Sequence, residues 1–152
     1  MILKKLKEWQ CDWGDPQLAI WIETLNSYIK RTDEDCILVA HSLACSLVAH
    51  WAANYESKHI VGALLVSPAD VDSESHTPQE VRNFSLMPTN KLPFKSIVIA
   101  SDNDPYVSLE RAEYFSKAWG SLFINCGSYG HINADAALGS WDYGKNLVKD
   151  LM

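Results

Sequence analysis

The sequence predicts a single α/β domain of three layers, with a mostly parallel sheet of about five strands covered by helices on both faces. Four short apolar runs, partly β-branched and bounded by polar or turn-forming residues, have the pattern of buried strands. Longer stretches with helical spacing alternate with these runs. Strands that alternate with helices imply crossover connections, and 152 residues are enough for one such domain.

The first half of the chain contains two of the expected strands. Residues 16–30 have apolar side chains at every third or fourth position, which predicts a helix. Residues 36–40 and 60–66 are continuous apolar runs, as expected for strands buried on both faces. Residues 44–55 lie between them and have helical spacing again.

A long segment, residues 70–94, interrupts the alternation. It contains three prolines among Asp, Ser, Glu, Thr and Asn, and it follows the end of an expected strand. In an open α/β sheet, sites lie outside the carboxyl ends of the strands, so a long insertion there is well placed to cover a site. A surface loop without a role is an equally good interpretation.

The second half returns to the alternating pattern. Residues 97–100 and 122–126 are the remaining apolar runs, and residues 109–119 and 141–151 have helical spacing. The expected order is therefore strand, helix, strand, helix, which extends the parallel sheet.

Charge and composition exclude several classes of partner. The formal charge of −6 and the small size of the basic cluster in residues 4–7 argue against nucleic-acid binding. Residues 1–9 lack the apolar core of a signal peptide, and no run approaches a membrane span. The four cysteines have no metal-ligand spacing and lie mostly in apolar surroundings. We expect a cytoplasmic protein without a metal or organic cofactor. The cysteines are Cys11, Cys36, Cys45 and Cys126.

Ser42 stands where the first buried run ends and a helix begins. Ala40 and Ala44 flank it at two-residue spacing, which is the pattern of a nucleophile elbow with alanine in place of both glycines. A sharp strand-to-helix turn exposes the serine and leaves no room for large neighbours. Small residues flank many serines, so the motif needs partners elsewhere in the chain. His41, which precedes Ser42, is expected to support the elbow.

An acid and a base follow in the chain order expected for this kind of fold. Asp102 and Asp104 come directly after residues 97–100, and His131 lies in a glycine-containing loop after residues 122–126. A serine needs a base to remove its proton, and the base needs an acid to orient it. Either aspartate could be that acid; we favour Asp104, although a turn or cap role is the alternative. The other histidines, at positions 50, 59 and 76, do not follow a strand in this way.

With these motifs the sequence resembles the α/β-hydrolases, and among them the small serine hydrolases of the retinoblastoma-binding-protein-nine type (the DUF1234 family). The similarity extends over nearly the whole chain, and its specific parts are AHSLA, SDNDPY and GHIN. It implies that Ser42 is the nucleophile, Asp104 the orienting acid and His131 the base. Asn103 stands where the family commonly has a second aspartate, which favours Asp104 over Asp102.

The resemblance also implies a difference at the N-terminus. Members of this family begin with a strand that ends in an HG-containing loop, and that loop donates one backbone N–H to the oxyanion hole. Here residues 3–9 would correspond to the second strand, which leaves Leu43 N–H as the donor and predicts impaired activity. We expect a shortened gene product or a start assigned too late, and an uncovered strand that favours strand exchange or homo-oligomers.

The sequence therefore predicts a serine hydrolase that cleaves a small carboxylic ester, thioester or amide through an acyl-enzyme. The alternatives are a non-catalytic interaction module on a hydrolase scaffold and an inactive, shortened family member. Five residues are candidates for contacts with the substrate, although core packing is the common fate of such apolar side chains. They are His41, Phe84, Leu86, Met87 and Tyr106.

Overall fold

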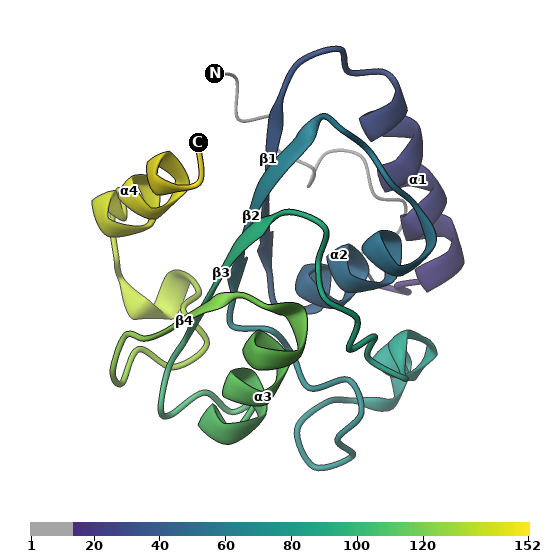
Figure 1. The fold of residues 1–152 in the computed structure, drawn as a ribbon. Helices are drawn as coiled ribbons and strands as arrows, with labels where there is room; N and C mark the ends of the chain where they lie inside the picture. Colours follow the sequence, from purple (N-terminus) through teal and green to yellow (C-terminus); the bar gives the residue numbers. More distant parts are fainter. Residues whose placement is uncertain (1–13) are drawn as a thin grey trace.

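The computed structural model describes residues 14–152. These residues form one sheet of four parallel strands in the order β1-β2-β3-β4, so that each strand pairs with the next along the chain (Figure 1). The strands are β1 (Cys36–His41), β2 (Ile60–Val66), β3 (Lys95–Ala100) and β4 (Leu122–Asn125).

Helices cover both faces of the sheet, but unequally. The helices are α1 (Leu18–Lys30), α2 (Leu43–Asn54), α3 (Leu109–Trp119) and α4 (Asp142–Asp150), with short 3₁₀ helices η2 (Gln79–Phe84) and η3 (Ala134–Ala136). The first three α-helices pack on one face, whereas α4 lies on the other (Figure 1). The predicted three-layer α/β architecture is confirmed.

The strand count is lower than the predicted number of about five. Each apolar run in residues 36–126 forms a strand, and β3 begins two residues before the predicted start because Lys95 pairs with Gly62. The additional strand expected at residues 3–9 falls outside the described part of the chain. Within residues 14–152, the structure therefore contains four of the roughly five predicted strands.

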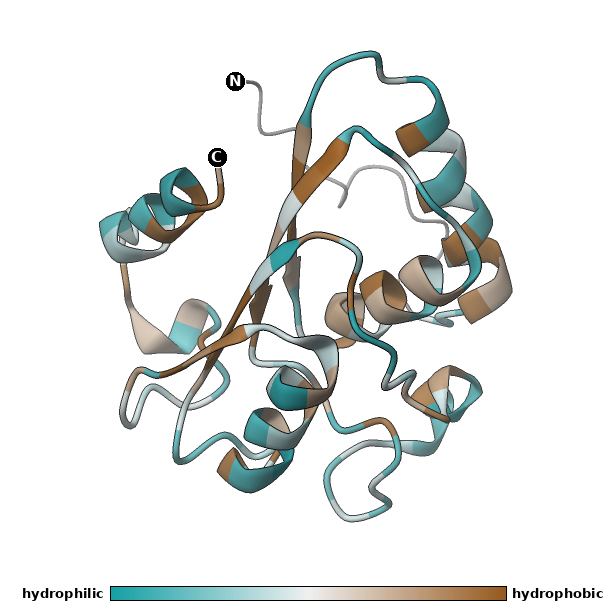
Figure 2. Ribbon diagram, viewed as in Figure 1, coloured by the Kyte–Doolittle hydropathy of each residue, from teal (hydrophilic) through white to brown (hydrophobic). Residues whose placement is uncertain are grey.

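Two apolar cores lie on the two sides of the sheet, and the apolar strands run between them (Figure 2). The larger core joins α1, α2 and α3 to the sheet and includes the fully buried side chains of Trp51, Phe115 and Trp119. The smaller core packs Leu147 and other side chains of the last helical segment against β2 and β3. Residues Ala63–Val66 within β2 are buried whichever way their side chains point, because both faces of this strand are covered.

Two strands depart from this burial. All four residues of β4 are exposed or half-buried, although the sequence predicted a buried strand at residues 122–126, and one face of β1 is open as well. Val39 is 46% exposed although it pairs with the buried Leu64 of β2. Among residues 14–152, β2 is the only strand paired with β1, so β1 is an edge strand within that range. A side chain at the end of β1 can therefore be reached from solvent, and Ser42 follows this strand directly.

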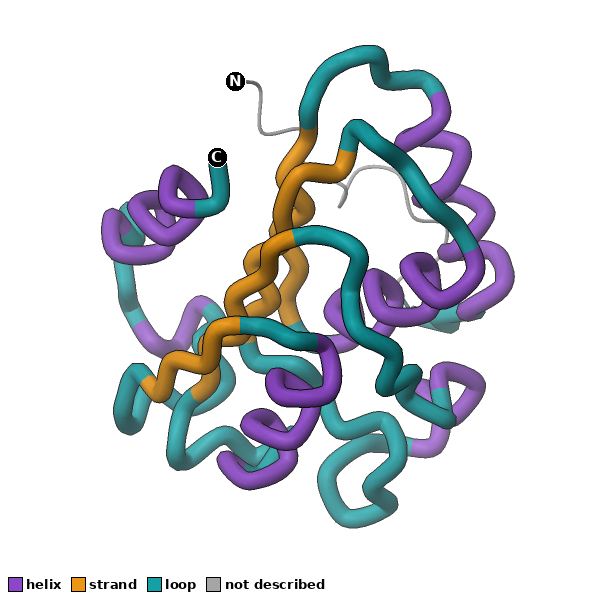
Figure 3. Tube along the Cα trace, in the orientation of Figure 1, coloured by secondary structure: helices purple, strands orange, loops and turns teal. Residues whose placement is uncertain are grey.

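The segment of residues 70–94 is packed against the body of the protein. Figure 3 shows it as loops around the short helix η2. Phe84, Met87 and Leu92 from this segment are buried in the larger core, and Phe84 meets Trp21 edge to face at 5.4 Å. Its polar stretches are anchored as well, by hydrogen bonds that involve Asp70 and Asp72. The segment is thus a fixed part of the fold beside the carboxyl end of the sheet.

This packing predicts how two nearby apolar positions differ. Replacing the fully buried Phe84 by alanine is expected to lower the free energy of unfolding by about 3–5 kcal/mol, because the large cavity cannot close. Leu86 is 81% exposed, so Leu86→Ala serves as the control and should change the stability by less than about 0.5 kcal/mol. Urea denaturation of both variants measures the difference. Equal effects at the two positions would contradict the described core.

Candidate active site

Ser42 occupies a tight turn between β1 and α2. Its backbone has φ 58° and ψ −123°, a conformation that residues other than glycine rarely adopt. The turn is held from both sides, because Ser42 N–H donates to Val66 O at 2.9 Å and Ser42 O accepts from Cys45 N–H at 3.0 Å. A strained serine at the end of a parallel strand is the geometry of a nucleophile elbow.

The residue beneath this turn is Cys45. Its side chain is fully buried, and its thiol donates to the carbonyl oxygens of Ala40 and Val66 at 3.5 and 3.4 Å. Burial raises the pKa of the Cys45 thiol far above its usual range, so the sulfur stays protonated. Cys45 therefore supports the elbow and has no nucleophilic character.

Asp104 and His131 form a buried pair at the same edge of the sheet. His131 Nδ1 lies 2.9 Å from each carboxylate oxygen of Asp104, and both residues are less than a tenth exposed. Asp104 Oδ1 also accepts the backbone N–H of Tyr106 at 2.9 Å, which fixes the carboxylate. In this arrangement Nδ1 donates to the carboxylate, and Nε2 is left as the basic nitrogen.

Hydrogen bonds connect the acid loop (residues 101–107) to the histidine loop (residues 126–133). Asn103 Oδ1 accepts from Gly130 N–H and from Ser101 Oγ, both at 2.7 Å. Asp102 accepts from Ser128 Oγ at 2.6 Å. Asp102 thus connects the two loops at the surface, whereas Asp104 contacts His131. The roles of Ser101 and Asn103 were missed from the sequence, where a polar loop gives no signal of which side chains pair.

Two further rings flank His131. The His41 ring lies 4.7 Å from it and the Tyr106 ring 4.5 Å, measured between centroids. His41 Nε2 donates to the backbone oxygen of His131 at 2.7 Å. Since His41 precedes Ser42, this bond holds the histidine loop directly against the elbow. His41 and Tyr106 are therefore the two of the five substrate-contact candidates that touch His131.

The hydrogen bond of His41 leads to a pH prediction. Desolvation of its inner edge lowers the pKa of His41 below 6.5, although part of the ring is exposed. The charged form is thus disfavoured in the folded state, so unfolding becomes easier as the pH falls below 6.5 toward the lower folded pKa.

The melting temperature of the wild type should fall when the pH is lowered from about 7.5 to about 5, across the usual His pKa of about 6.5. The melting temperature of His41→Gln should fall by less over the same change, because this variant lacks the buried imidazole. Melting temperatures of the two proteins in parallel buffers measure this difference, and contributions from histidines that do not contact His41 cancel in the comparison. An identical pH dependence in both proteins would contradict the assignment.

The Ser42 hydroxyl is not hydrogen-bonded to His131, although both belong to the described range. Catalytic hydrogen bonds are often long in the free enzyme and shorten when substrate binds. Leu43 N–H, at the first position of α2, cannot have an intrahelical partner and is free to face an oxyanion. The elbow thus offers a hydroxyl and a backbone donor side by side.

The remaining substrate-contact candidates lie elsewhere. Phe84 and Met87 are buried in the larger core, and Leu86 is largely exposed. A separate cavity of about 350 Å³ lies beside the histidine loop. Its lining is mostly apolar and consists of Ile124, Asn125, Cys126, Tyr129, Ile132, Leu138, Trp141 and Tyr143.

Neither metal ligands nor a membrane helix is found in the part of the chain that is described. Residues 14–152 contain no cluster of three or more His, Cys, Asp or Glu side chains suited to hold a metal ion. None of the helices in this range combines the length and the apolar character needed to cross a membrane.

Comparison with known families identifies the family of this chain. The model of the family described as serine hydrolase matches residues 3–150, which is nearly the entire chain. The protein belongs to the serine hydrolase family. No curated protein matches the sequence of this serine hydrolase at a significant level.

Solved structures place this serine hydrolase among the α/β-hydrolases. A YdeN-like hydrolase from Pectobacterium atrosepticum is 28% identical, with a TM-score of 0.80 over 93% of this chain and 72% of its own. The YdeN product of B. subtilis is 19% identical, with a TM-score of 0.70 over 90% and 76% of the two chains. Est1E from Butyrivibrio proteoclasticus is also 19% identical, with a TM-score of 0.69 over 92% and 71%. The latter two similarities concern the fold alone.

Proposed function

We propose that this serine hydrolase cleaves a carboxylic ester, thioester or amide through a triad of Ser42, His131 and Asp104. The observation that carries the proposal is the buried Asp104–His131 pair, in which His131 Nδ1 lies 2.9 Å from the carboxylate. The backbone oxygen of His131 also accepts a hydrogen bond from His41, the residue before Ser42. Three strand ends thus contribute one acid, one base and one strained serine to the same edge of the sheet.

The chemistry proceeds in two steps. Ser42 Oγ attacks the carbonyl carbon while His131 Nε2 takes its proton, and Asp104 stabilises the imidazolium that forms. Leu43 N–H donates to the oxyanion, and His131 then protonates the leaving group. Water, activated by His131, hydrolyses the acyl-enzyme and restores Ser42.

The oxyanion hole sets the expected speed. Leu43 N–H is the donor that the described residues supply beside Ser42, and we identify no second donor among residues 14–152. One such donor typically contributes about 10²- to 10³-fold to turnover. We therefore propose that this chain hydrolyses esters slowly unless a further segment completes the hole.

Hydrolysis of chromogenic esters tests the proposal. The full chain is incubated with p-nitrophenyl esters of short and medium acyl chains, with a matched thioester and a matched anilide. We expect release of the leaving group above the background of Ser42→Ala, with the anilide slowest because its amine is the poorest leaving group. Equal rates for wild type and Ser42→Ala on every substrate would refute a hydrolase centred on Ser42.

Two observations favour the second candidate, a non-catalytic interaction module. The Ser42 hydroxyl and His131 are not hydrogen-bonded, although both are described, and the neighbouring strand β1 exposes Val39 at one edge of the sheet. A folded protein that hydrolyses none of these substrates would support this candidate.

A further inference from the structure

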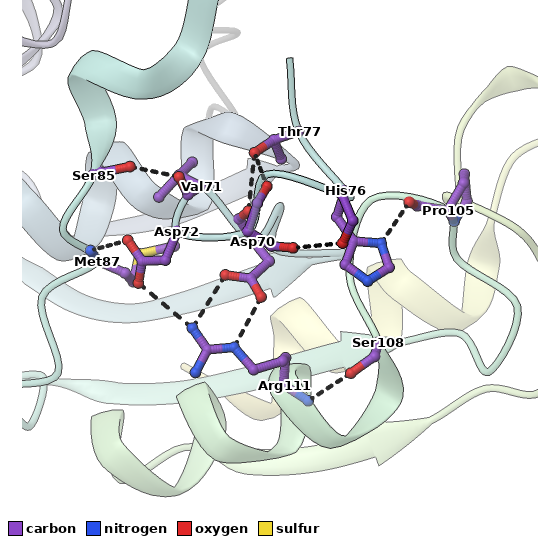
Figure 4. A network of polar contacts seen from close by, with 12 residues as sticks. Asp70, Val71, Asp72, His76, Thr77, Ser85, Met87, Pro105, Ser108 and Arg111 are labelled. Carbon is purple, nitrogen blue, oxygen red and sulfur yellow. Dashed lines mark hydrogen bonds and ion pairs between the residues drawn. The ribbon is translucent and has the colours of Figure 1, made fainter. Parts of the chain in front are cut away.

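An ion pair between a buried carboxylate and a partly exposed guanidinium lies outside the proposed triad. Asp70 is only 2% exposed, and its two carboxylate oxygens accept from Arg111 Nε at 2.8 Å and Nη2 at 3.1 Å (Figure 4). The same guanidinium lies 3.5 Å from Asp72 Oδ2. Asp70 begins the long segment after β2, whereas Arg111 lies in the first turn of α3, so the pair joins two distant parts of the sequence.

Arg111 is held firmly enough to act as an anchor. Its backbone N–H donates to the helix-capping Ser108 Oγ at 3.2 Å, and its guanidinium packs over the Phe115 ring at 4.5 Å. A two-pronged bond between a guanidinium and a carboxylate fixes orientation as well as distance. A buried carboxylate also depends on its partner, because an unpaired charge in this position is strongly unfavourable.

The segment that starts at Asp70 also touches the acid loop through the main chain. Asp70 N–H donates to Tyr106 O at 3.0 Å. The ring nitrogen His76 Nδ1 donates to Pro105 O at 2.9 Å (Figure 4). Thr77 Oγ1 donates to Asp70 O at 3.0 Å, which ties the segment back on itself. Asp70 therefore holds α3 with its side chain and the acid loop with its backbone.

Tyr106 connects Asp70 to the proposed triad. Its N–H donates to Asp104 Oδ1 at 2.9 Å, and its ring packs against the His131 ring with centroids 4.5 Å apart. We infer that Arg111, acting through Asp70 and Tyr106, is a positioning residue that sets the geometry of the Asp104–His131 pair. This inference rests on the proposed function, since it assigns Arg111 a role in the same reaction.

The expected consequence is a loss of turnover at unchanged substrate binding. A displacement of about 1 Å at catalytic groups costs up to about 10²-fold in rate, so Arg111→Gln should lower kcat by about 10- to 100-fold. KM should stay unchanged, because Arg111 lies on α3 and Asp70 is buried, so neither is placed to bind substrate. Arg111→Lys keeps the charge but loses the two-pronged bond, so its loss of kcat should be smaller.

The experiment compares kcat per active site for wild type, Arg111→Gln, Arg111→Lys, Asp70→Asn and the double variant Asp70→Asn/Arg111→Gln. Titration with a fluorophosphonate counts the active sites, which removes the contribution of misfolded protein. If Arg111 acts through Asp70, adding Arg111→Gln to Asp70→Asn should lower kcat no further. Lys117→Gln, which breaks the exposed pair with Glu113 on the same helix, is the matched control and should leave kcat unchanged.

The outcomes separate this inference from the function on which it rests. A lower kcat per titrated site at constant KM, with partial rescue by Arg111→Lys, supports the positioning role. If the variants keep the wild-type kcat per site, the positioning role is overturned. A raised KM at constant kcat also overturns it, because the segment would then contribute to substrate binding. If Arg111→Gln does not fold, Arg111→Lys decides in the same way. A wild type that is neither labelled nor active overturns the proposed function together with this inference.

Discussion

Replacing Ser42 by alanine is expected to lower ester hydrolysis by about 10⁴- to 10⁶-fold, because the attacking oxygen is lost and the remaining groups act only on bound water. The alanine side chain fits the turn, since Ser42 makes no side-chain hydrogen bond to α2 that the fold would miss. Steady-state rates on the best p-nitrophenyl ester, with the fold checked by circular dichroism, measure the effect.

Ser46 provides the matched control for this substitution. It lies one turn further along α2, and its buried hydroxyl has no hydrogen-bond partner in the described structure. Removing a buried hydroxyl that is not hydrogen-bonded should be nearly neutral. Ser46→Ala should therefore keep the wild-type rate, and a loss at Ser46 equal to that at Ser42 would contradict the elbow as the site of attack.

Replacing Asp104 by asparagine is expected to lower kcat by about 10⁴-fold. Asparagine fits the same space, but its amide can donate a hydrogen bond to His131 Nδ1. The imidazole proton then lies on Nε2, which can no longer accept the proton of Ser42. End-point assays with long incubation and concentrated enzyme can measure a kcat that is lower by this factor. The melting temperature serves as the check that the variant is folded.

The matched control for Asp104 is two residues away. Asp102 bonds to Ser128 Oγ at the surface and does not touch His131, so Asp102→Asn should reduce kcat only slightly through the loosened loop contact. A larger loss in Asp102→Asn than in Asp104→Asn would reverse the assignment and make Asp102 the orienting acid.

The fold was predictable because its central strands, β2 and β3, are buried on both faces. Apolar runs such as residues 60–66 have no polar face, and in this chain they alternate with amphipathic stretches such as residues 109–119. Strand ends were less predictable, as β3 begins at Lys95, whose polarity gave no sign of its pairing with Gly62. The arrangement of residues 3–9 lies outside the described range.

The sequence also predicted which side chains would meet at the edge of the sheet. Asp104 and His131 each follow a strand, and parallel strands end at a common edge, so their proximity follows from topology. Contacts that depend on packing could not be predicted. Phe84 is an example, because nothing in its local sequence distinguishes a pocket wall from a core residue. The Asp70–Arg111 pair is another, since its members are 41 positions apart and surrounded by other charged residues.

The most direct test of the central claim is the site of covalent labelling. The full chain is treated with a fluorophosphonate, and the modified residue is located by peptide mass spectrometry in wild type and in His131→Ala. We predict one phosphonylated residue, Ser42, and a loss of labelling in His131→Ala because the base is gone. Labelling at another residue, or folded wild type without labelling, would contradict the triad of Ser42, His131 and Asp104.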